Sequence, residues 1–178
     1  MRCFYSSEFY LELPDGHPFP MDKFEISKDM LVGSGIVKGE DIIEVQAAEN
    51  HVLKRVHDQD YLSKIYYGQL DRKEQIQLGL PLTPKLYQRS ATEVEATRQA
   101  CHAALQDGVA AVLAGGTHHS FQNRGEGYCV FNDIAIAIRD LQVHRPGIKI
   151  MVVDTDAHQG NGTNSILGDD PNVFTYSI

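Results

Sequence analysis

No apolar run in this sequence approaches the roughly 20 residues that a helix needs to cross a bilayer. The first ten residues, MRCFYSSEFY, also lack the long apolar stretch of a secretory signal peptide. Both absences argue against membrane insertion and against export. We therefore expect a soluble protein with a cytoplasmic location.

Cysteines and basic residues are also few. The three cysteines are an odd number without zinc-finger spacing, so we expect reduced thiols at Cys3, Cys101 and Cys129. The sequence has 16 Lys and Arg against 24 Asp and Glu, a net charge of −8, which disfavours a nucleic-acid partner. This charge would suit a cationic substrate, but it is ordinary for a soluble protein and decides little.

Repeats, low-complexity tracts and linkers are absent as well. The 178 residues are 42% hydrophobic and 22% charged, close to the average for globular proteins. This length and composition fit one domain, 1–178, around one buried core.

Helical and strand patterns alternate along the chain. Apolar spacing predicts helices over 23–31, 58–67, 90–107 and 131–141, the third opened by a Ser90/Glu93 capping box. Short apolar runs predict strands over 2–5, 42–47, 109–114, 148–153 and 172–178, those at 109–114 and 148–153 buried on both faces. The polar, proline-containing segment 68–89 is expected to be a surface loop. This alternation predicts an α/β fold with a mostly parallel sheet between helical layers.

Metal-capable side chains follow the strand at 148–153, where ligands bind in such sheets. Asp154, Asp156 and His158 occupy alternate positions, which point the same way in an extended chain, so we expect them to converge. A carboxylate with an imidazole suits zinc or a related divalent ion. The alternative is an Asp-rich turn between a strand and a helix. Because two carboxylates there would repel each other without a cation, metal binding is favoured.

Two adjacent histidines, His118 and His119, follow the strand at 109–114 through Gly115-Gly116. Neighbouring side chains diverge in an extended loop, so we expect the two rings to flank a reacting centre rather than share a metal ion. Imidazoles titrate near neutral pH and can therefore transfer protons. A histidine pair alone is weak evidence of function, but its position at the same sheet edge as the Asp-x-Asp-x-His cluster favours catalysis.

The segment after the histidines contains Gly125 and Gly127, which permit unusual backbone angles or close approach of a ligand. Tyr128 is a candidate pocket wall, and Asn132-Asp133 is a candidate helix cap. Taken alone, this segment is more typical of a structural loop with one packed aromatic side chain.

Together these motifs resemble the histone deacetylase superfamily, which includes bacterial acetylpolyamine amidohydrolases and acetoin-utilisation proteins. The specific part is GGTHHSFQNRGEGYCVFNDIAIA followed by VVDTDAHQGNGT, and GHPFPMDKF and RVHDQDYL add a likeness to the bacterial and class IV-like branch. The resemblance runs along essentially the whole chain. It implies a three-layer α/β/α fold of the arginase/deacetylase type with a parallel sheet.

The resemblance also implies roles for single residues. Asp156 and His158 would bind Zn²⁺, while His118 and His119 would form the acid–base pair. Asp154 would partner His118.

Further implied roles lie around this centre. Asp154, Ser177 and the carbonyl of Ile178 would hold a potassium ion, K⁺. Gly127 would contact an acyl-lysine side chain through its backbone, and Tyr128 would form the aromatic wall beside it. Asn161 would orient His119 in place of the aspartate of many members, and an amide stabilises an imidazolium less than a carboxylate does.

The family's third zinc ligand, glycine-rich loop and transition-state tyrosine have no counterpart in 1–178. The chain therefore resembles the N-terminal, truncated half of a deacetylase domain, and we expect little or no catalysis from it alone. Asp169-Asp170 is expected to be an exposed turn, not a substitute ligand. The strand at 172–178 would leave an open sheet edge, inviting self-association or a complementary C-terminal half.

Three functions stay open from the sequence. The first is zinc-dependent hydrolysis of an acyl-amide by the complete protein, on acetyl-lysine or an acetylated polyamine or amine. The second is a non-catalytic fragment that acts as an interaction module. The third is a manganese ureohydrolase of the same fold, although His118-His119 with Asp156/His158 fits one zinc ion better than two manganese ions.

Overall fold

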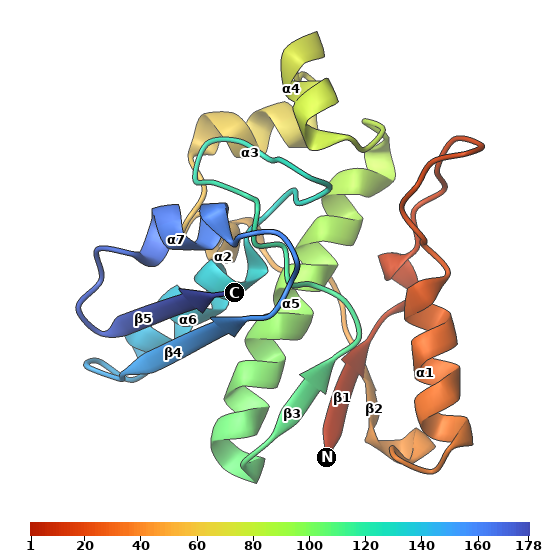
Figure 1. The fold of residues 1–178 in the computed structure, drawn as a ribbon, viewed down its shortest axis with the longest axis vertical. Helices are drawn as coiled ribbons and strands as arrows, with labels where there is room; N and C mark the ends of the chain where they lie inside the picture. The colour runs from red at the N-terminus through yellow and green to blue at the C-terminus, as the bar shows by residue number, and fades with distance from the viewer.

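The computed structural model describes all 178 residues and contains two parallel sheet segments. Strands β1 (Arg2–Tyr5), β2 (Ile42–Glu44) and β3 (Ala110–Val112) form the first, in the order β2-β1-β3. Strands β4 (Ile150–Asp154) and β5 (Val173–Ser177) form the second (Figure 1). All pairs are parallel, as predicted, but no ladder joins the two segments.

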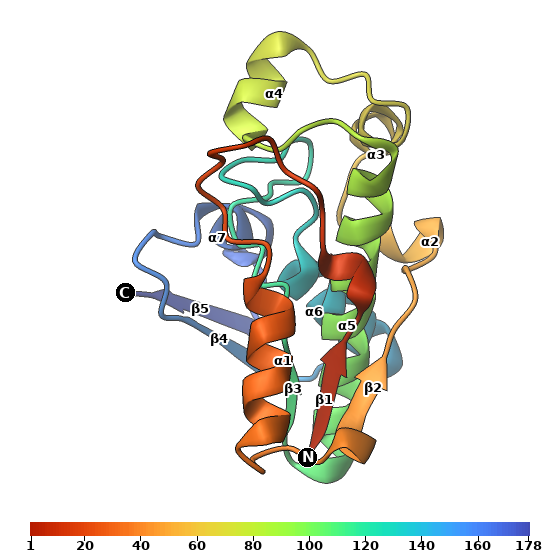
Figure 2. The same cartoon turned by 90° about the vertical axis from the view of Figure 1, so that its right-hand side faces the viewer.

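Helices cover both faces of the first segment. Helix α1 (Lys23–Gly33) lies on one side and α5 (Pro84–Asp107) on the other (Figure 2). Tyr5 of β1 faces α1, where the Lys28 ammonium lies 4.8 Å from its ring centroid. Its neighbour Phe4 lies on the α5 side, in a hollow that Ala103 also lines. Both residues are buried, which accounts for the continuous apolar sequence of this strand.

The second segment is covered on one face only. Helices α6 (Asp133–His144) and α7 (Asn161–Leu167) lie on one side of β4 and β5 (Figure 1). The opposite face carries four large apolar side chains that are each at least half exposed: Met151, Val153, Phe174 and Tyr176. The prediction that 148–153 is a strand buried on both faces is therefore wrong for alternate residues.

The segment predicted to be a surface loop, 68–89, is largely helical. Helix α4 (Arg72–Leu78) starts with a capping box between Asp71 and Glu74 and ends at Gly79, whose φ of 75° favours glycine. The long helix α5 begins at Pro84 instead of Ser90, because proline is preorganised for the first helical turn. Ser90 and Glu93 are buried within α5 and form no capping box.

The other predicted elements are confirmed to within a few residues, including α1, the end of α5 at Gly108, and all five strands. The short helix α2 (Asn50–Leu53) precedes α3 (Gln59–Tyr66), and two 3₁₀ turns span Ser7–Phe9 and Gly39–Asp41. None of the helices combines the length and apolarity required to traverse a bilayer.

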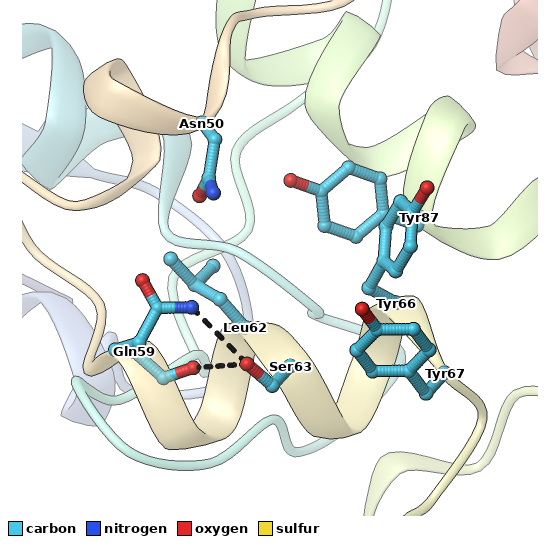
Figure 3. Close-up of a pocket in the computed structure, with 7 residues that line it drawn as sticks. All are labelled: Asn50, Gln59, Leu62, Ser63, Tyr66, Tyr67 and Tyr87. Carbon is cyan, nitrogen blue, oxygen red and sulfur yellow. Dashed lines mark hydrogen bonds between the residues drawn. The ribbon is translucent and has the colours of Figure 1, made fainter.

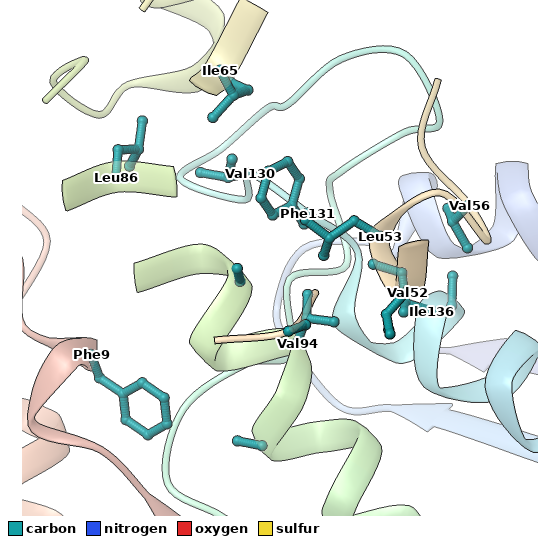
Figure 4. Close-up of a cluster of buried hydrophobic side chains, with 14 of the residues drawn as sticks. Phe9, Val52, Leu53, Val56, Ile65, Leu86, Val94, Val130, Phe131 and Ile136 are labelled. Carbon is teal, nitrogen blue, oxygen red and sulfur yellow. The ribbon is translucent and has the colours of Figure 1, made fainter. Parts of the chain in front are cut away.

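The apolar core is one cluster of 30 buried residues that joins α2, α3, α5 and the start of α6. Phe131 lies at its centre (Figure 4), with the rings of Tyr87, Tyr61 and His57 at centroid distances of 5.5, 6.2 and 5.3 Å. His57 is the imidazole among these rings. Its Nδ1 lies 3.2 Å from the Gln122 carbonyl, and its Nε2 accepts the N–H of Asn132 at 2.9 Å. His57 is therefore held as a neutral imidazole between two points of the segment that joins β3 to α6.

The pH dependence of stability should report this buried imidazole. Burial lowers the pKa of His57 to about 4, despite the opposing effect of the Gln122 carbonyl, whereas the unfolded chain binds a proton near pH 6.5. As the pH falls from 7 to 5, the unfolded state therefore binds a proton at this residue and the folded state does not. This difference should lower the free energy of unfolding by about 2 kcal/mol. Urea titrations at both pH values measure this loss.

The control is His57→Gln, which keeps a donor and an acceptor but cannot titrate. This variant should lose about 2 kcal/mol less than the wild type over the same interval. Equal losses in both proteins would show that His57 does not carry the effect.

Candidate functional site

The carboxyl ends of β3 and β4 bring the two predicted motifs to one cavity. The histidine loop follows β3, and the Asp-x-Asp-x-His loop follows β4 (Figure 1). A cavity of about 380 Å³ is lined by both loops, including His118, His119, Asp156 and His158. This is the sheet edge at which α/β proteins bind ligands.

The two histidine rings lie against each other, so the prediction that they diverge is wrong. Their centroids are 4.1 Å apart at an interplanar angle of 41°. The reason is local backbone: the loop is a turn, in which His118 N–H donates to the Gly116 carbonyl and Ser120 N–H to the Thr117 carbonyl. The alternation expected of extended chain does not apply there.

Each ring is fixed by an oxygen acceptor at Nδ1. His118 Nδ1 lies 2.5 Å from Asp154 Oδ2, and His119 Nδ1 lies 2.7 Å from Asn161 Oδ1. The Asn161 oxygen also accepts the N–H of Gly162 at 2.9 Å, which identifies this atom as the amide oxygen. Both rings therefore carry a proton on Nδ1 and leave Nε2 for proton transfer.

The loop after β4 turns instead of continuing the strand. Asp154 Oδ1 accepts the N–H of Asp156 at 3.0 Å, and Asp156 Oδ1 accepts the N–H of His158 at 2.8 Å, as in successive Asx turns. Asp154 therefore faces His118, while Asp156 and His158 line the main cavity. The expected convergence of all three side chains is correct only for the last two.

Asp156 and His158 fit a zinc ion as a partial ligand set. Asp156 Oδ1 lies 3.2 Å from His158 Nδ1 and 3.9 Å from His118 Nε2. The hydrogen bond from the His158 backbone, helped by both imidazoles, holds the pKa of Asp156 below its ordinary value, so the carboxylate is ionised. No third His, Cys, Asp or Glu has a ligand atom within 4.8 Å of ligand atoms of both Asp156 and His158. Catalytic zinc sites have three protein ligands, and two are present in this cavity.

The residues expected to hold potassium lie behind this cavity. Asp154 pairs with Ser177 across β4 and β5, and both line a separate hollow of about 240 Å³. Ser177 Oγ accepts the N–H of Gly160 at 3.1 Å, and Ile178 N–H donates to the Asp154 carbonyl at 3.2 Å. Potassium binding at Asp154, Ser177 and Ile178 stays a prediction.

Gly127 and Tyr128 form another wall of the main cavity. Tyr128 is the only non-glycine residue with positive φ, at 68°, a strained conformation of the kind found at functional sites. A Cβ atom at Gly127 would lie 2.8 Å from His119 Cδ2, so only glycine fits beside that ring. The backbone N–H groups of both residues donate to carbonyls at the end of α4, those of Gln77 and Leu78. The helix missed by sequence analysis thus positions this wall.

A buried ion pair, also missed, lines the same cavity. Arg89 Nη2 lies 2.7 Å from Glu93 Oε1, and both side chains are almost fully buried in α5. Burial raises the pKa of Glu93 to about 7, while Arg89 acts in the opposite direction. The spacing of four residues was a usable signal for this pair.

The histidine loop is anchored by Asp133, which the sequence indicated only as a helix cap. Its carboxylate accepts the N–H groups of Gly116 at 3.0 Å and Thr117 at 2.8 Å, and the hydroxyl of Thr97 at 2.5 Å. The cap itself is Asn132, whose side chain accepts the N–H of Ala135. A side chain at Gly115, where φ is 80°, would place Cβ 2.4 Å from this carboxylate.

Asp169-Asp170 does not substitute for a ligand. Asp169 is exposed as expected, but Asp170 turns toward α6 and pairs with Arg139. A further hollow of about 370 Å³ lies between α2, α3 and α5 (Figure 3). Its seven lining residues include Tyr66, Tyr67 and Tyr87 but no carboxylate or imidazole, so it lacks the groups for metal binding or acid–base chemistry.

Comparison with known proteins agrees with this geometry. A family model, histone deacetylase domain, matches residues 17–178. The chain is 38% identical to an uncharacterized protein of Picosynechococcus sp., over 98% of this chain and 58% of that protein. It is 30% identical to acetoin utilization protein AcuC of Bacillus subtilis, over 91% of this chain and 44% of that protein. The chain thus spans about half the length of these relatives.

Among solved structures, the crystal structure of an HDAC homolog from Aquifex aeolicus matches with a TM-score of 0.80 at 20% identity. The match covers 99% of this chain and 50% of that one. It confirms the predicted α/β fold, in which a parallel sheet is packed with helices.

Removing the Asp133 carboxylate should loosen the histidine loop. Asp133→Ala leaves three donors without their acceptor in a buried site, so the free energy of unfolding should fall by on the order of 3 kcal/mol. Asp107→Ala is the matched control, because the Asp107–Arg2 pair is partly exposed and should contribute under about 1 kcal/mol. Denaturant unfolding of both variants measures the difference. Similar losses would mean that Asp133 is not the anchor.

Proposed function

This chain belongs to the histone deacetylase family, and from that premise we propose that the protein hydrolyses acyl-amide bonds with the help of zinc. The substrate class is an acetylated amine, either acetyl-lysine in a protein or a small acetylated amine or polyamine. The observation that carries the proposal is the imidazole pair, whose rings lie 4.1 Å apart beside Asp156 and His158. Hydrolysis of an amide by this route needs both the imidazole pair and the metal-binding pair.

The metal would be held by Asp156 and His158, and a zinc ion there would polarise the amide carbonyl and activate water for attack. The remaining steps belong to the imidazoles. One ring accepts the proton of the attacking water, and the other delivers a proton to the leaving amine. The carboxylate of Asp154 supports positive charge on His118, whereas the amide of Asn161 orients His119 without adding charge. This difference favours His118 as the ring that delivers the proton to the leaving amine.

Gly127 and Tyr128 are proposed to bind the substrate stem. Gly127 allows the backbone to approach the His119 ring closely. Tyr128 packs edge-on against His17 and Phe19, with ring centroids 5.5 and 5.4 Å away. An aliphatic acyl-lysine stem can pack along such an aromatic wall.

We further propose that a family-length protein completes this site. Two ligands from this chain leave zinc short of the usual three, and the chain spans about half the length of its relatives. The third ligand and an oxyanion donor would then come from residues outside these 178. The same residues would cover Met151, Val153, Phe174 and Tyr176, which in this chain form an exposed apolar surface. Partnership with a complementary half is therefore favoured over self-association.

Two other functions fit less well. A dinuclear manganese ureohydrolase needs several carboxylates around one cavity, but Asp154 faces His118 and leaves Asp156 with His158. A non-catalytic interaction module would not need Nδ1 of both imidazoles fixed by oxygen acceptors. Location in the cytoplasm remains part of the proposal.

The first test is His119→Ala in the family-length protein. Loss of a proton-transferring group should lower turnover of a fluorogenic acetyl-lysine peptide by 10²–10⁴-fold, on the usual scale for such groups. Zinc content should be unchanged, since His119 bonds Asn161 and not the proposed ligands. The matched control is His51→Ala, an exposed histidine outside this cavity, which should keep full turnover. Near-normal activity of the first variant would refute the assignment of His119.

The second test compares residues 1–178 alone with the family-length protein, both supplied with zinc. We expect turnover only from the longer protein, because the shorter one provides two zinc ligands. Chelator-sensitive turnover by 1–178 at a comparable rate would contradict the proposal that the site is completed from outside.

A further inference from the structure

A second cluster of ligand-type side chains lies between the two long helices, away from the catalytic cavity. His102 projects from α5, and Asp140 and His144 project from α6 one turn apart. His102 Nε2 lies 2.7 Å from Asp140 Oδ2, and His144 Nδ1 lies 3.6 Å from the same oxygen. One ligand atom from each residue lies within 4.8 Å of the others.

We propose that His102, Asp140 and His144 bind one divalent transition-metal ion, such as Zn²⁺ or Co²⁺, that ties α5 to α6. Two imidazoles and one carboxylate are the donors that such ions prefer, and the hard ions Mg²⁺ and Ca²⁺ favour oxygen ligands instead. Water would complete the coordination. This site does not depend on the proposed deacetylase activity.

The position on α6 separates this site from the catalytic one. Asp133 at the start of α6 anchors the catalytic histidine loop. Asp140 and His144 lie seven and eleven residues further along the helix, a rise of roughly 10 and 16 Å. None of His102, Asp140 and His144 lines the cavity that contains Asp156 and His158, so the two sites are separate.

The ligands are oriented by a second shell. Arg55 Nε lies 3.2 Å from Asp140 Oδ1 as an ion pair without a hydrogen bond, while Oδ2 faces His102. His144 Nδ1 lies 2.8 Å from the Asp140 main-chain carbonyl, so this nitrogen carries the proton and Nε2 is the one that can coordinate. Burial acts to raise the pKa of Asp140, but His102, Arg98 and Arg55 hold it below its ordinary value, so the carboxylate is ionised.

Two arginines lie near the Asp140 carboxylate, and further carboxylates lie around them. Arg98 directs Nε and Nη2 to Glu95, at 2.8 and 2.6 Å, and approaches Asp140 Oδ2 only to 3.4 Å. A hollow of about 400 Å³ beside the cluster is lined by Arg55 and Arg98 and by four carboxylates: Glu44, Glu49, Glu95 and Asp140. Along this hollow the carboxylates outnumber the guanidinium groups by two.

The ion would exchange one hydrogen bond for coordination. His102 Nε2 donates to the ionised Asp140 Oδ2, so metal binding at this nitrogen would replace that proton. With bonds of about 2.0–2.1 Å, a tetrahedral zinc ion needs ligand atoms roughly 3.3 Å apart. His102 Nε2 and Asp140 Oδ2 must therefore separate by about half an ångström. The His144 ring must also turn, because Nδ1 and not Nε2 is the atom that now lies 3.6 Å from this carboxylate. His144 is half exposed, so its side chain has room to do so.

The test uses the protein expressed from its native gene, stripped of metal with a chelator and carrying His158→Ala to remove the catalytic metal pair. Equilibrium dialysis against Zn²⁺ and Co²⁺ should give one bound equivalent and a rise in the thermal unfolding midpoint. Adding His144→Ala should weaken metal binding at least tenfold and abolish that rise. Asp140→Asn, which keeps the side-chain shape, provides a second variant should the first be unstable.

The matched control is His51→Ala in the same His158→Ala background, because His51 lines the same hollow without belonging to the cluster. It should bind metal as tightly as its parent. Equal metal binding with and without His144, or an equal loss on removing His51, would overturn the proposal.

Discussion

The buried carboxylate of Asp133 connects the histidine loop to the rest of the fold. It accepts two backbone N–H groups of the loop after β3 and the hydroxyl of Thr97 on α5, while its own residue begins α6. The loop is a turn with two positive-φ glycines, Gly115 and Gly116, and has no ladder of its own to hold it. Without this acceptor, the two N–H groups would be left unpaired in a buried site, at a cost comparable to a lost hydrogen bond for each. The position of the imidazoles of His118 and His119 therefore depends on how α5 and α6 pack together.

The second constraint is the pair of oxygen acceptors behind the imidazoles. Asp154 ends β4 and Asn161 begins α7, so the rings of one loop are oriented by the two ends of another. One acceptor is charged and the other neutral, although the rings are neighbours. A carboxylate stabilises a neighbouring imidazolium more than an amide does. In the proposed function, these different acceptors would let two adjacent histidines take the roles of acid and base.

Sequence reasoning identified the motifs and most elements, because apolar strands that run into glycine and polar residues are a local signal. It placed Asp156, His158, His118 and His119 at one sheet edge, and the structure brings them to one cavity.

The errors of the sequence predictions came from packing and from turns. The rings of His118 and His119 meet because the loop turns, and Asp154 separates from Asp156 because Asx turns replace the extended chain. Signals for α4 and for the start of α5 were present in Asp71-x-x-Glu74 and Pro84 but were outweighed by the polar composition of the segment. The three donors that converge on the Asp133 carboxylate depend on tertiary contacts and have no local signature.

In the proposed function, the exposure of the β4 side chains and the exposure of Asp156 and His158 have a common physical explanation. Met151 and Val153 alternate with covered residues along β4, and Asp156 and His158 follow at its carboxyl end with half or more of each side chain in solvent. Water stabilises exposed charged groups but not exposed apolar side chains. A surface that exposes both kinds of group side by side is therefore uncommon. A protein layer over β4 and β5 would satisfy both, because it would bury the apolar face and would place further ligands at the strand end. It would also lower the dielectric around the imidazoles, where charge interactions then gain strength. Covering the sheet and completing the metal site are therefore, in the proposed function, one structural event.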